Sequence, residues 1–513
     1  MRDCLVYRRW SIQSSTERRN RGMTATPALD LQAPGQLFIG GRWVPPDEGM
    51  TTDVVCPATG ERIGRVASAT ESDVDRAMRA AHDAFVREWS KTTADERYEM
   101  LMELADRVLE HGDRLRMIDT VDSGSTVRVI GEDVDHAANF LRMYAGFARQ
   151  MRGTSVALDP NRMTYTVREP YGVVVHPIPF NRPLRFAAHA LGVTLAGGNT
   201  TVLKPSEYTP LATLELAELS RTIFPPGVIN VLTGFGPRCG APLVAHPLVD
   251  KVHFRGSAQT GKRVAVQCAE RSVPYTLELG GKNPMVVFPD ADVAAAARGG
   301  VKALNLGIQG QSCSSATRLL VHDDIYDEYR ERLIAELAAV RPGLPWDRNA
   351  DMGSIVSRPQ YDRVLGFIES GRRSGATLLA GGCPVDDPAL AKGLYIEPTL
   401  FEITDPTIEI ATEEIFGPVT CLLRWTDEDE AIRIANSVVY GHCASVWTRD
   451  LARAHRASSR LDVGVVWVND HSVRPDGMPF GARKASGIGQ EHAIEELSYY
   501  TQEKSIMVNI GNA

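Results

Sequence analysis

The sequence has few cysteines, and they lack the spacing that would give them a structural role. Eight occur in 513 residues, at positions 4, 56, 239, 268, 313, 383, 421 and 443. They include no CxxC pair and no cluster, which a disulfide framework or a structural zinc site would require. We therefore expect neither, and no metal.

An excess of positive charge and long apolar runs are also missing. Lys and Arg number 56 against 64 Asp and Glu, so the net charge is −8 and no basic field would attract nucleic acid or acidic lipid. No run approaches the roughly 18 apolar residues needed to cross a bilayer. We expect a cytoplasmic protein with neither nucleic acid nor a membrane as partner.

The N-terminus differs from the rest of the chain. Its first 22 residues are rich in Arg and Ser and contain only two acidic residues, Asp3 and Glu17, as in an organellar transit peptide. The alternatives are a disordered arm, or an upstream start codon with Met23 as the true first residue. We expect residues 1–29 to form a disordered N-terminal extension.

The remaining chain has the length of several domains and a repeating α/β pattern. Short β-branched runs at 172–175, 200–203, 228–232 and 251–254 alternate with helical stretches, which predicts a doubly wound parallel sheet with ligands at the carboxyl ends of its strands. After Gly280 a second series of strands (285–288, 318–321, 419–424, 463–468) and helices (324–340, 361–370, 426–435) predicts another α/β unit. The cleft between the two units is the default site.

Two strand ends could bind a nucleotide. The segment Phe254–Gly261 follows a strand and opens a helix, where Ser257 and free amides make an anion site or an ordinary helix cap. Lys204 and Glu207 end another strand and could bind sugar hydroxyls, and a carboxylate there would repel a 2′-phosphate, which favours NAD over NADP. The glycines between Gly234 and Gly240 are misplaced for a dinucleotide fingerprint, so we assign them to a turn.

Three residues could carry covalent chemistry. Cys313 lies among small residues just before a strand, where a thiolate could be reached, although most cysteines are simply buried. Glu278 ends an apolar strand and could act as a general base, and the Asn181 amide could stabilise an oxyanion. No histidine has a motif position that favours it as a partner of Cys313; His442 could equally be core or catalytic.

Together these residues resemble the aldehyde dehydrogenase superfamily over roughly residues 37 to 508. The motifs that carry the resemblance, in chain order, are Pro179-Phe-Asn-Arg-Pro183, Lys204-Pro-Ser-Glu207, Gly256-Ser257 with Gly261, Glu278-Leu-Gly-Gly281, Gly310-Gln-Ser-Cys313, Glu413-Glu-Ile-Phe-Gly-Pro418, and Pro479-Phe-Gly481 with Ser486-Gly487. Seven motifs in the family's order make the resemblance specific.

The resemblance implies oxidation of an aldehyde to the carboxylic acid. Cys313 would form a thiohemiacetal and then a thioester, Asn181 would hold the oxyanion, and Glu278 would activate water. The residues implied in NAD binding are Lys204, Glu207, Gly256, Ser257, Gly261, Leu279, Gln360, Glu414 and Phe416. The rivals are a coenzyme A-acylating dehydrogenase, a thiol esterase using the same cysteine, and a catalytically silent scaffold.

The resemblance also implies a domain division. A Rossmann-like NAD-binding domain would comprise residues 30–150 and 169–280, a catalytic domain residues 281–489, and a β oligomerisation arm residues 151–168 and 490–513. The arm would make a homodimer or homotetramer. From the residues alone, these two β-rich pieces could also be edge strands of their own chain.

Some residues depart from the family pattern. Arg255 stands where many relatives have Thr, which puts the cofactor pose in question, and Arg182 replaces a side chain that is commonly aromatic. Arg182, Phe186 and His189 lie on one helical face that lines the aldehyde tunnel in relatives. Arg182 and His189 could therefore bind a carboxylated or hydroxylated aromatic aldehyde, unless a protein carboxylate neutralises Arg182.

Overall fold

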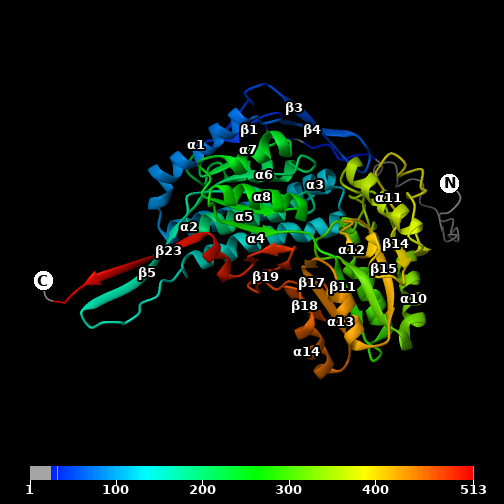
Figure 1. Cartoon of the computed structure of the whole chain (residues 1–513). Coiled ribbons are helices and arrows are strands. Elements are labelled where there is room, and N and C mark those ends of the chain that lie inside the picture. Colours follow the sequence, from blue (N-terminus) through cyan, green and yellow to red (C-terminus); the bar gives the residue numbers. More distant parts are fainter. Residues whose placement is uncertain (1–24, 30, 32, 512–513) are drawn as a thin grey trace.

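The computed structural model describes residues 25–29, 31 and 33–511 (Figure 1). Residues 1–24 lie outside these ranges, and with them the expectations of a transit segment, a disordered arm and a start at Met23. Within the described part of the chain, no helix combines the length and the apolar character needed to cross a membrane.

The first sheet contains the βα repetition predicted from the sequence. Its strands, in order across the sheet, are β2 (Arg42–Val44), β1 (Leu37–Ile39), β8 (Ile229–Val231), β7 (Thr200–Lys204), β6 (Val173–Pro177), β9 (Lys251–Arg255), β10 (Tyr275–Glu278) and β21 (Gly487–Ile488). The strands from β8 to β10 are parallel, whereas β1, β2 and β21 are antiparallel to their neighbours. The prediction of a parallel α/β sheet is confirmed.

Helices cover both faces of this sheet because its central strands are apolar on both sides. Val174 of β6 packs with one set of helices, and Val173 and Val175 pack with the other. The first set is α2 (Ala94–Glu110), α3 (Gly112–Ser123), α4 (Val127–Ala148), α5 (Pro183–Ala196) and α6 (Leu211–Ser220). The second set is α1 (Glu71–Arg87), α7 (Ala241–Ala245) and α8 (Ala258–Glu270).

Local sequence signals set the start of the first two helices. Thr70 caps α1 and Thr93 caps α2. Each threonine side chain accepts a hydrogen bond from the backbone N–H three residues on, and the carboxylate of that third residue accepts one from the backbone N–H of the threonine. The sequence alone predicts a cap at each start, because Thr70 precedes Asp73 by three positions and Thr93 precedes Glu96 by three. Such a cap contributes about 1 kcal/mol by satisfying amides that have no partner in the first helical turn.

The second sheet follows directly on the first. Its order is β13 (Thr377–Ala380), β14 (Thr399–Glu402), β15 (Val419–Trp425), β12 (Ala316–His322), β11 (Asn283–Val287), β17 (Cys443–Trp447) and β18 (Val465–Val468), and only β13 is antiparallel among the described strands. Its helices are α9 (Val293–Ala303), α10 (Asp323–Ala338), α11 (Arg358–Arg373), α12 (Glu409–Thr412), α13 (Glu428–Asn436) and α14 (Leu451–Arg460). The elements of this unit that were not predicted from the sequence are β13, β14, β17, α9, α12 and α14.

A long two-stranded ribbon projects from the body of the molecule (Figure 1). It pairs β5 (Arg162–Pro170) with β23 (Thr501–Asn509) along their full length. Three shorter ribbons pair β3 (Thr51–Val55) with β4 (Arg62–Ala67), β16 (Tyr440–Gly441) with β20 (Arg483–Lys484), and β19 (Phe480–Gly481) with β22 (Gln490–Glu491). Short helical turns lie at Trp89–Lys91, Gly236–Gly240, Leu306–Ile308 and Ile494–Tyr499.

Candidate active site

Parallel strands bring the predicted site residues to one edge of the first sheet. Lys204 and Glu278 are the last residues of β7 and β10, Asn181 follows β6, and Ser257 follows β9. All four line a cavity of about 1110 Å³ that also contains Cys313 of the second α/β unit. The predicted cleft between the two units is therefore where these side chains meet.

Most of the residues expected to bind a cofactor line this cavity. They are Lys204, Glu207, Gly256, Ser257, Leu279, Gln360, Glu414 and Phe416. Gly261 is the exception, because it is buried in α8 and packs on Leu279, whose Cδ2 would lie 2.5 Å from an added Cβ. The glycine thus lets α8 pack closely on Leu279, and its contact with a cofactor stays a prediction.

One end of the cavity suits a ribose and a pyrophosphate. Lys204 Nζ donates to the Pro205 carbonyl at 3.0 Å and to Glu207 Oε2 at 3.4 Å, which leaves one ammonium hydrogen and the carboxylate for sugar hydroxyls. At the start of α8, Ser257 Oγ accepts from the N–H of Thr260, next to further helix amides that could bind an anion. The segment that we had assigned to a turn forms a helical turn at 236–240, and Gly236 and Gly240 line the same cavity.

The other end is bounded by the segment after α12. Glu414 accepts a hydrogen bond from the Gly281 N–H at 3.0 Å, and burial raises the pKa of its carboxyl to about 7. Phe416 adopts a φ of 58°, and Gln360 supports it by donating to its carbonyl at 2.9 Å. Gln360 therefore lines the cavity and also holds the backbone of Phe416 in place.

Cys313 lies deep in the cavity, just before β12, with only 8% of its surface exposed. Its loop depends on Gly310, whose φ is 71° and whose added Cβ would lie 2.3 Å from the Gly417 carbonyl. Burial raises the pKa of the Cys313 thiol well above its ordinary value, the negative charge of Glu278 raises it further, and the positive charge of Arg474 lowers it.

Two amide side chains hold the surroundings of Cys313. Asn181 donates from Nδ2 to the carbonyl of Gln311 at 3.0 Å, which fixes its amide and leaves its second N–H hydrogen for another acceptor. Asn283 donates to the Cys313 carbonyl at 2.8 Å and accepts from the Cys443 N–H at 3.1 Å. The Asn181 amide is thus preorganised beside the thiol, as oxyanion stabilisation requires.

Glu278 has a partner that the sequence did not assign to it. Nε2 of His442 lies 2.5 Å from Oε1 of Glu278, and donor atoms of both residues lie within 4.8 Å of the Cys313 sulfur. His442 precedes β17, which the sequence analysis had not recognised. No sequence signal could have identified this pair, because the two residues are 164 positions apart.

A smaller cavity of about 80 Å³ adjoins Cys313 and is strongly cationic. Its lining includes Arg182, Arg185, Phe186 and Arg474. Arg182, which precedes α5, and Arg185, which lies within it, share one buried carboxylate, that of Asp133, at 2.6 Å from Arg182 and 3.7 Å from Arg185. The alternative that a protein carboxylate neutralises Arg182 is therefore the one observed.

Arg474 is the arginine of this cavity that pairs with no described acidic residue. Its guanidinium donates to Ser314 Oγ at 2.8 Å and lies over the Phe480 ring, 4.0 Å from the ring centre. It belongs to the loop after β18, a segment without a periodic pattern in the sequence. No motif marks it as a site residue.

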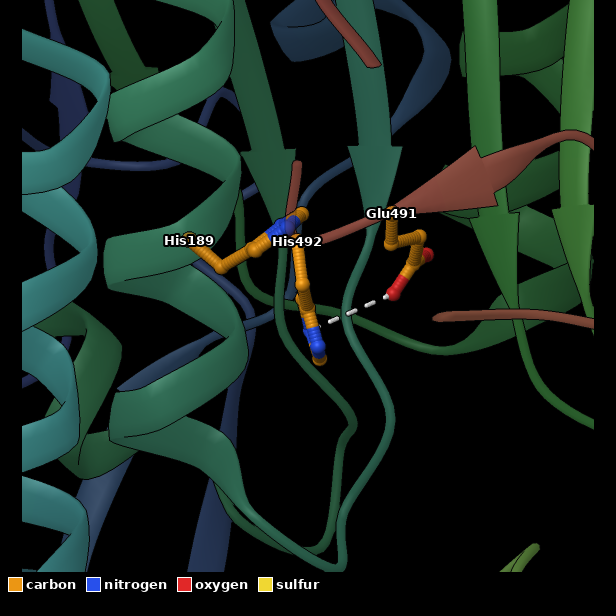
Figure 2. Close-up of side chains that lie close together, drawn as sticks. All are labelled: His189, Glu491 and His492. Carbon is orange, nitrogen blue, oxygen red and sulfur yellow. Dashed lines mark ion pairs between the residues drawn. The ribbon is translucent and has the colours of Figure 1, made fainter. Parts of the chain in front are cut away.

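His189 does not line either cavity, so its expected contact with substrate is not met. Its ring is fully buried and contacts Arg255 Nη2 at 2.7 Å and Glu496 Oε2 at 3.2 Å. Figure 2 shows it reaching from α5 toward Glu491 and His492, whose ion pair is 3.7 Å long. This trio has the donor atoms of a metal site, but the Arg255 guanidinium already supplies the positive charge there.

Comparisons with known proteins all indicate the same protein family. The sequence model of the aldehyde dehydrogenase family matches residues 43–506 of this chain. An aldehyde dehydrogenase, tropH, of Talaromyces stipitatus is 41% identical over 485 residues, which are 93% of this chain and 94% of that protein.

Solved structures give the same result. A putative aldehyde dehydrogenase from Burkholderia cenocepacia superposes with a TM-score of 0.91 at 40% identity, covering 94% of this chain and 98% of that one. A betaine aldehyde dehydrogenase from Staphylococcus aureus in complex with NAD+ gives 0.92 at 34% identity, covering 94% and 96%.

Proposed function

This chain belongs to the aldehyde dehydrogenase family and is an oxidoreductase acting on aldehydes; we propose that it uses NAD+ and a thioester on Cys313 to make a carboxylic acid. The observation that carries the proposal is the meeting of Cys313, Asn181 and Glu278 in one cavity large enough for a dinucleotide. Each of the three side chains supplies a different part of the chemistry.

In the first step the Cys313 thiol releases its proton to solvent water, and the resulting thiolate adds to the aldehyde carbon, which turns the carbonyl oxygen into an oxyanion. The free N–H hydrogen of Asn181 stabilises this oxyanion, since its other hydrogen already holds the Gln311 carbonyl. NAD+ held by the cavity lining would supply the acceptor for the hydride of the thiohemiacetal carbon. The carbonyl reforms and leaves a thioester on Cys313.

In the second step Glu278 removes a proton from a water molecule. The water oxygen bonds to the acyl carbon, the C–S bond breaks, and the carboxylic acid leaves. This base argues for the hydrolytic reaction over the coenzyme A-acylating alternative, because a thiol acceptor has no need of a positioned base for water. A catalytically silent scaffold would need none of the three residues.

The test is aldehyde-dependent NADH formation by the wild-type enzyme and by Cys313→Ala. We expect the wild-type enzyme to form acid and NADH without coenzyme A, and Cys313→Ala to lose turnover while it still binds NAD+. Retained oxidation by the variant would remove the nucleophile assignment. Ester cleavage without any aldehyde oxidation would favour the thiol esterase.

The lining of the cavity supports NAD over NADP. The Glu207 carboxylate lies beside Lys204 at the end of β7, where it can accept from both hydroxyls of an adenosine ribose. A 2′-phosphate at the same place would meet a like charge.

The small cavity supports an anionic aldehyde as substrate, with Arg474 as its partner. Asp133 already compensates Arg182 and Arg185, whereas none of the described acidic residues pairs with Arg474. A carboxylated aldehyde bound to Cys313 would place its negative charge toward this free guanidinium. The hypothesis first attached to Arg182 and His189 therefore moves to Arg474.

The ribbon of β5 and β23 supports an oligomerisation arm. Large apolar side chains on and next to it are exposed, with Leu158 at 77%, Met507 at 72% and Ile510 at 61%. A second copy of the chain would cover them in a homodimer or homotetramer. Light scattering of a Met507→Lys, Ile510→Lys variant should show a smaller particle than the wild-type protein.

A further inference from the structure

His442 places a buried imidazole directly behind the proposed general base. It lies between β16 and β17 with its side chain completely buried, and its Nε2 is 2.5 Å from Oε1 of Glu278. The Glu278 side chain keeps 12% of its surface exposed and lines the cavity of Cys313. One oxygen of the carboxylate is thus engaged by protein, while the group as a whole remains open to the site.

The position of this imidazole is tied to that of the nucleophile. Asn283 accepts from the N–H of Cys443, the residue after His442, and donates to the carbonyl of Cys313. Space on this side is also tight, because a Cβ added to Gly281 would lie 2.9 Å from the His442 Cβ and 2.7 Å from the Cys313 carbonyl oxygen. The positions of the His442 imidazole and of Cys313 are therefore coupled through the Asn283 amide and the tight packing at Gly281.

The surroundings of His442 favour one tautomer of its ring. Its Nδ1 is buried and has no hydrogen-bond partner among the described residues. An N–H at Nδ1 would be a buried donor without an acceptor, which costs about 1–3 kcal/mol. The tautomer with its hydrogen on Nε2 avoids that cost and donates to the Glu278 carboxylate.

We propose that His442 is a positioning residue that holds Glu278 toward the thioester and thereby sets the rate of deacylation. By occupying Oε1, the imidazole restricts rotation of the carboxylate and leaves the other oxygen to take the proton of water. His442 gains and loses no proton in this step. The inference rests on the proposed thioester mechanism and adds a residue to it.

Other charged groups lie around the pair and must stay unchanged in a test. Cys313, Cys443 and Glu414 are close enough to Glu278 for its charge to act on their ionisation, and Arg474 acts on both cysteines. A useful variant therefore alters the hydrogen bond at Glu278 without adding charge. His442→Gln, His442→Asn and His442→Leu meet this condition.

These three variants differ in one property. The amide nitrogen of Gln reaches the place of Nε2, the amide of Asn reaches only the place of Nδ1, and Leu has no donor. His455→Leu, at an exposed position of α14, is the matched control. The experiment measures the NADH burst of the first turnover, the steady-state rate, and the steady-state rate with hydroxylamine, a nucleophile that cleaves thioesters without a base to activate it.

We expect His442→Leu and His442→Asn to keep the burst and to lose about 10- to 100-fold in steady-state rate, since a misplaced base slows only deacylation. Hydroxylamine should restore most of the loss, and His442→Gln should lie within a few-fold of wild type. A purely structural role predicts loss of the burst and no rescue by hydroxylamine.

Three results would overturn the inference: a wild-type steady-state rate in His442→Leu, no rescue by hydroxylamine, or equal rates in the Gln and Asn variants. If His442→Leu does not fold, the comparison of steady-state rates between His442→Gln and His442→Asn tests the inference instead. Both amide side chains are polar and differ only in how far they reach. Absence of a thioester in the wild-type enzyme would overturn the proposed mechanism as well, and is seen without any variant.

Discussion

Arg255 and Glu491, which are 236 residues apart in the chain, form a buried ion pair next to the cavity. Nε and Nη2 of the guanidinium lie 3.0 and 2.9 Å from the same carboxylate oxygen. The expectation that Arg255 disturbs the cofactor pose therefore needs refinement. The residue borders the cavity, but Glu491 compensates its charge and the His189 ring packs against it.

Loss of this pair should weaken the fold more than the chemistry. We expect Arg255→Met to lower the free energy of unfolding by about 3–5 kcal/mol, because Glu491 would remain buried without a counter-charge. Urea unfolding followed by tryptophan fluorescence measures the change. Arg79→Met, which breaks the exposed pair with Asp75, is the control and should have little effect. Equal effects of the two variants would contradict this account.

Glu278→Gln should separate the two chemical steps. The amide cannot accept the proton of water, so we expect a normal first burst of NADH followed by turnover about 100- to 1000-fold slower than wild type. Stopped-flow absorbance at the NADH band measures both phases. Glu413→Gln, an exposed neighbour of the cavity, should behave as wild type. A linear trace at the wild-type rate from Glu278→Gln would exclude it as the deacylation base.

Removing the carboxylate beside the ribose site should relax cofactor choice. We expect Glu207→Gln to lower the ratio of kcat/KM for NAD over NADP about tenfold, because a 2′-phosphate would no longer meet a like charge. The ratio is measured with one aldehyde and both cofactors. Glu270→Gln, an exposed change at the end of α8, serves as control. An unchanged ratio for Glu207→Gln would place the discrimination elsewhere.

The two arginines near Cys313 should differ in what they recognise. We expect Arg474→Leu to lower the kcat/KM ratio of a carboxylated over a neutral aldehyde about tenfold, and Arg182→Leu to leave it unchanged, because Asp133 compensates only the latter. Alkylation of Cys313 tests the same charge without an aldehyde. Arg474→Leu should slow reaction with iodoacetate more than with iodoacetamide. The reverse order of the two variants would return the anion site to Arg182.

Stability should fall in mild acid. Burial lowers the pKa of His253 and of His471 to about 4, below the ordinary value near 6.5 that each regains on unfolding. The neutral rings therefore contribute fully above pH 6.5, and each loses roughly 1.4 kcal/mol per pH unit as the pH falls from 6.5 toward 4. Urea midpoints at pH 8, 6.5 and 5 measure the loss. A constant midpoint over this range would show that folding does not lower the pKa of either ring.

Much of the fold was predictable because its signals are local. The alternation of short apolar runs with amphipathic stretches predicted the parallel sheet, and Thr70 and Thr93 predicted two helix starts that the structure confirms. The strands β13, β14 and β17 were missed because short apolar runs cannot be assigned by periodicity alone. Motifs at strand ends predicted most of the cavity lining, since neighbouring parallel strands end at the same edge of a sheet.

The chain by itself determined which chemical groups are present and which strand ends carry them: a thiol, an amide and a carboxylate suited to aldehyde oxidation. Only the tertiary structure decided how those groups are paired. His442 with Glu278, Asp133 with Arg182 and Glu491 with Arg255 join residues from distant parts of the chain. Ion pairs and hydrogen bonds act over a few ångströms of space whatever the separation in sequence. The partner of a buried charge is therefore chosen by packing.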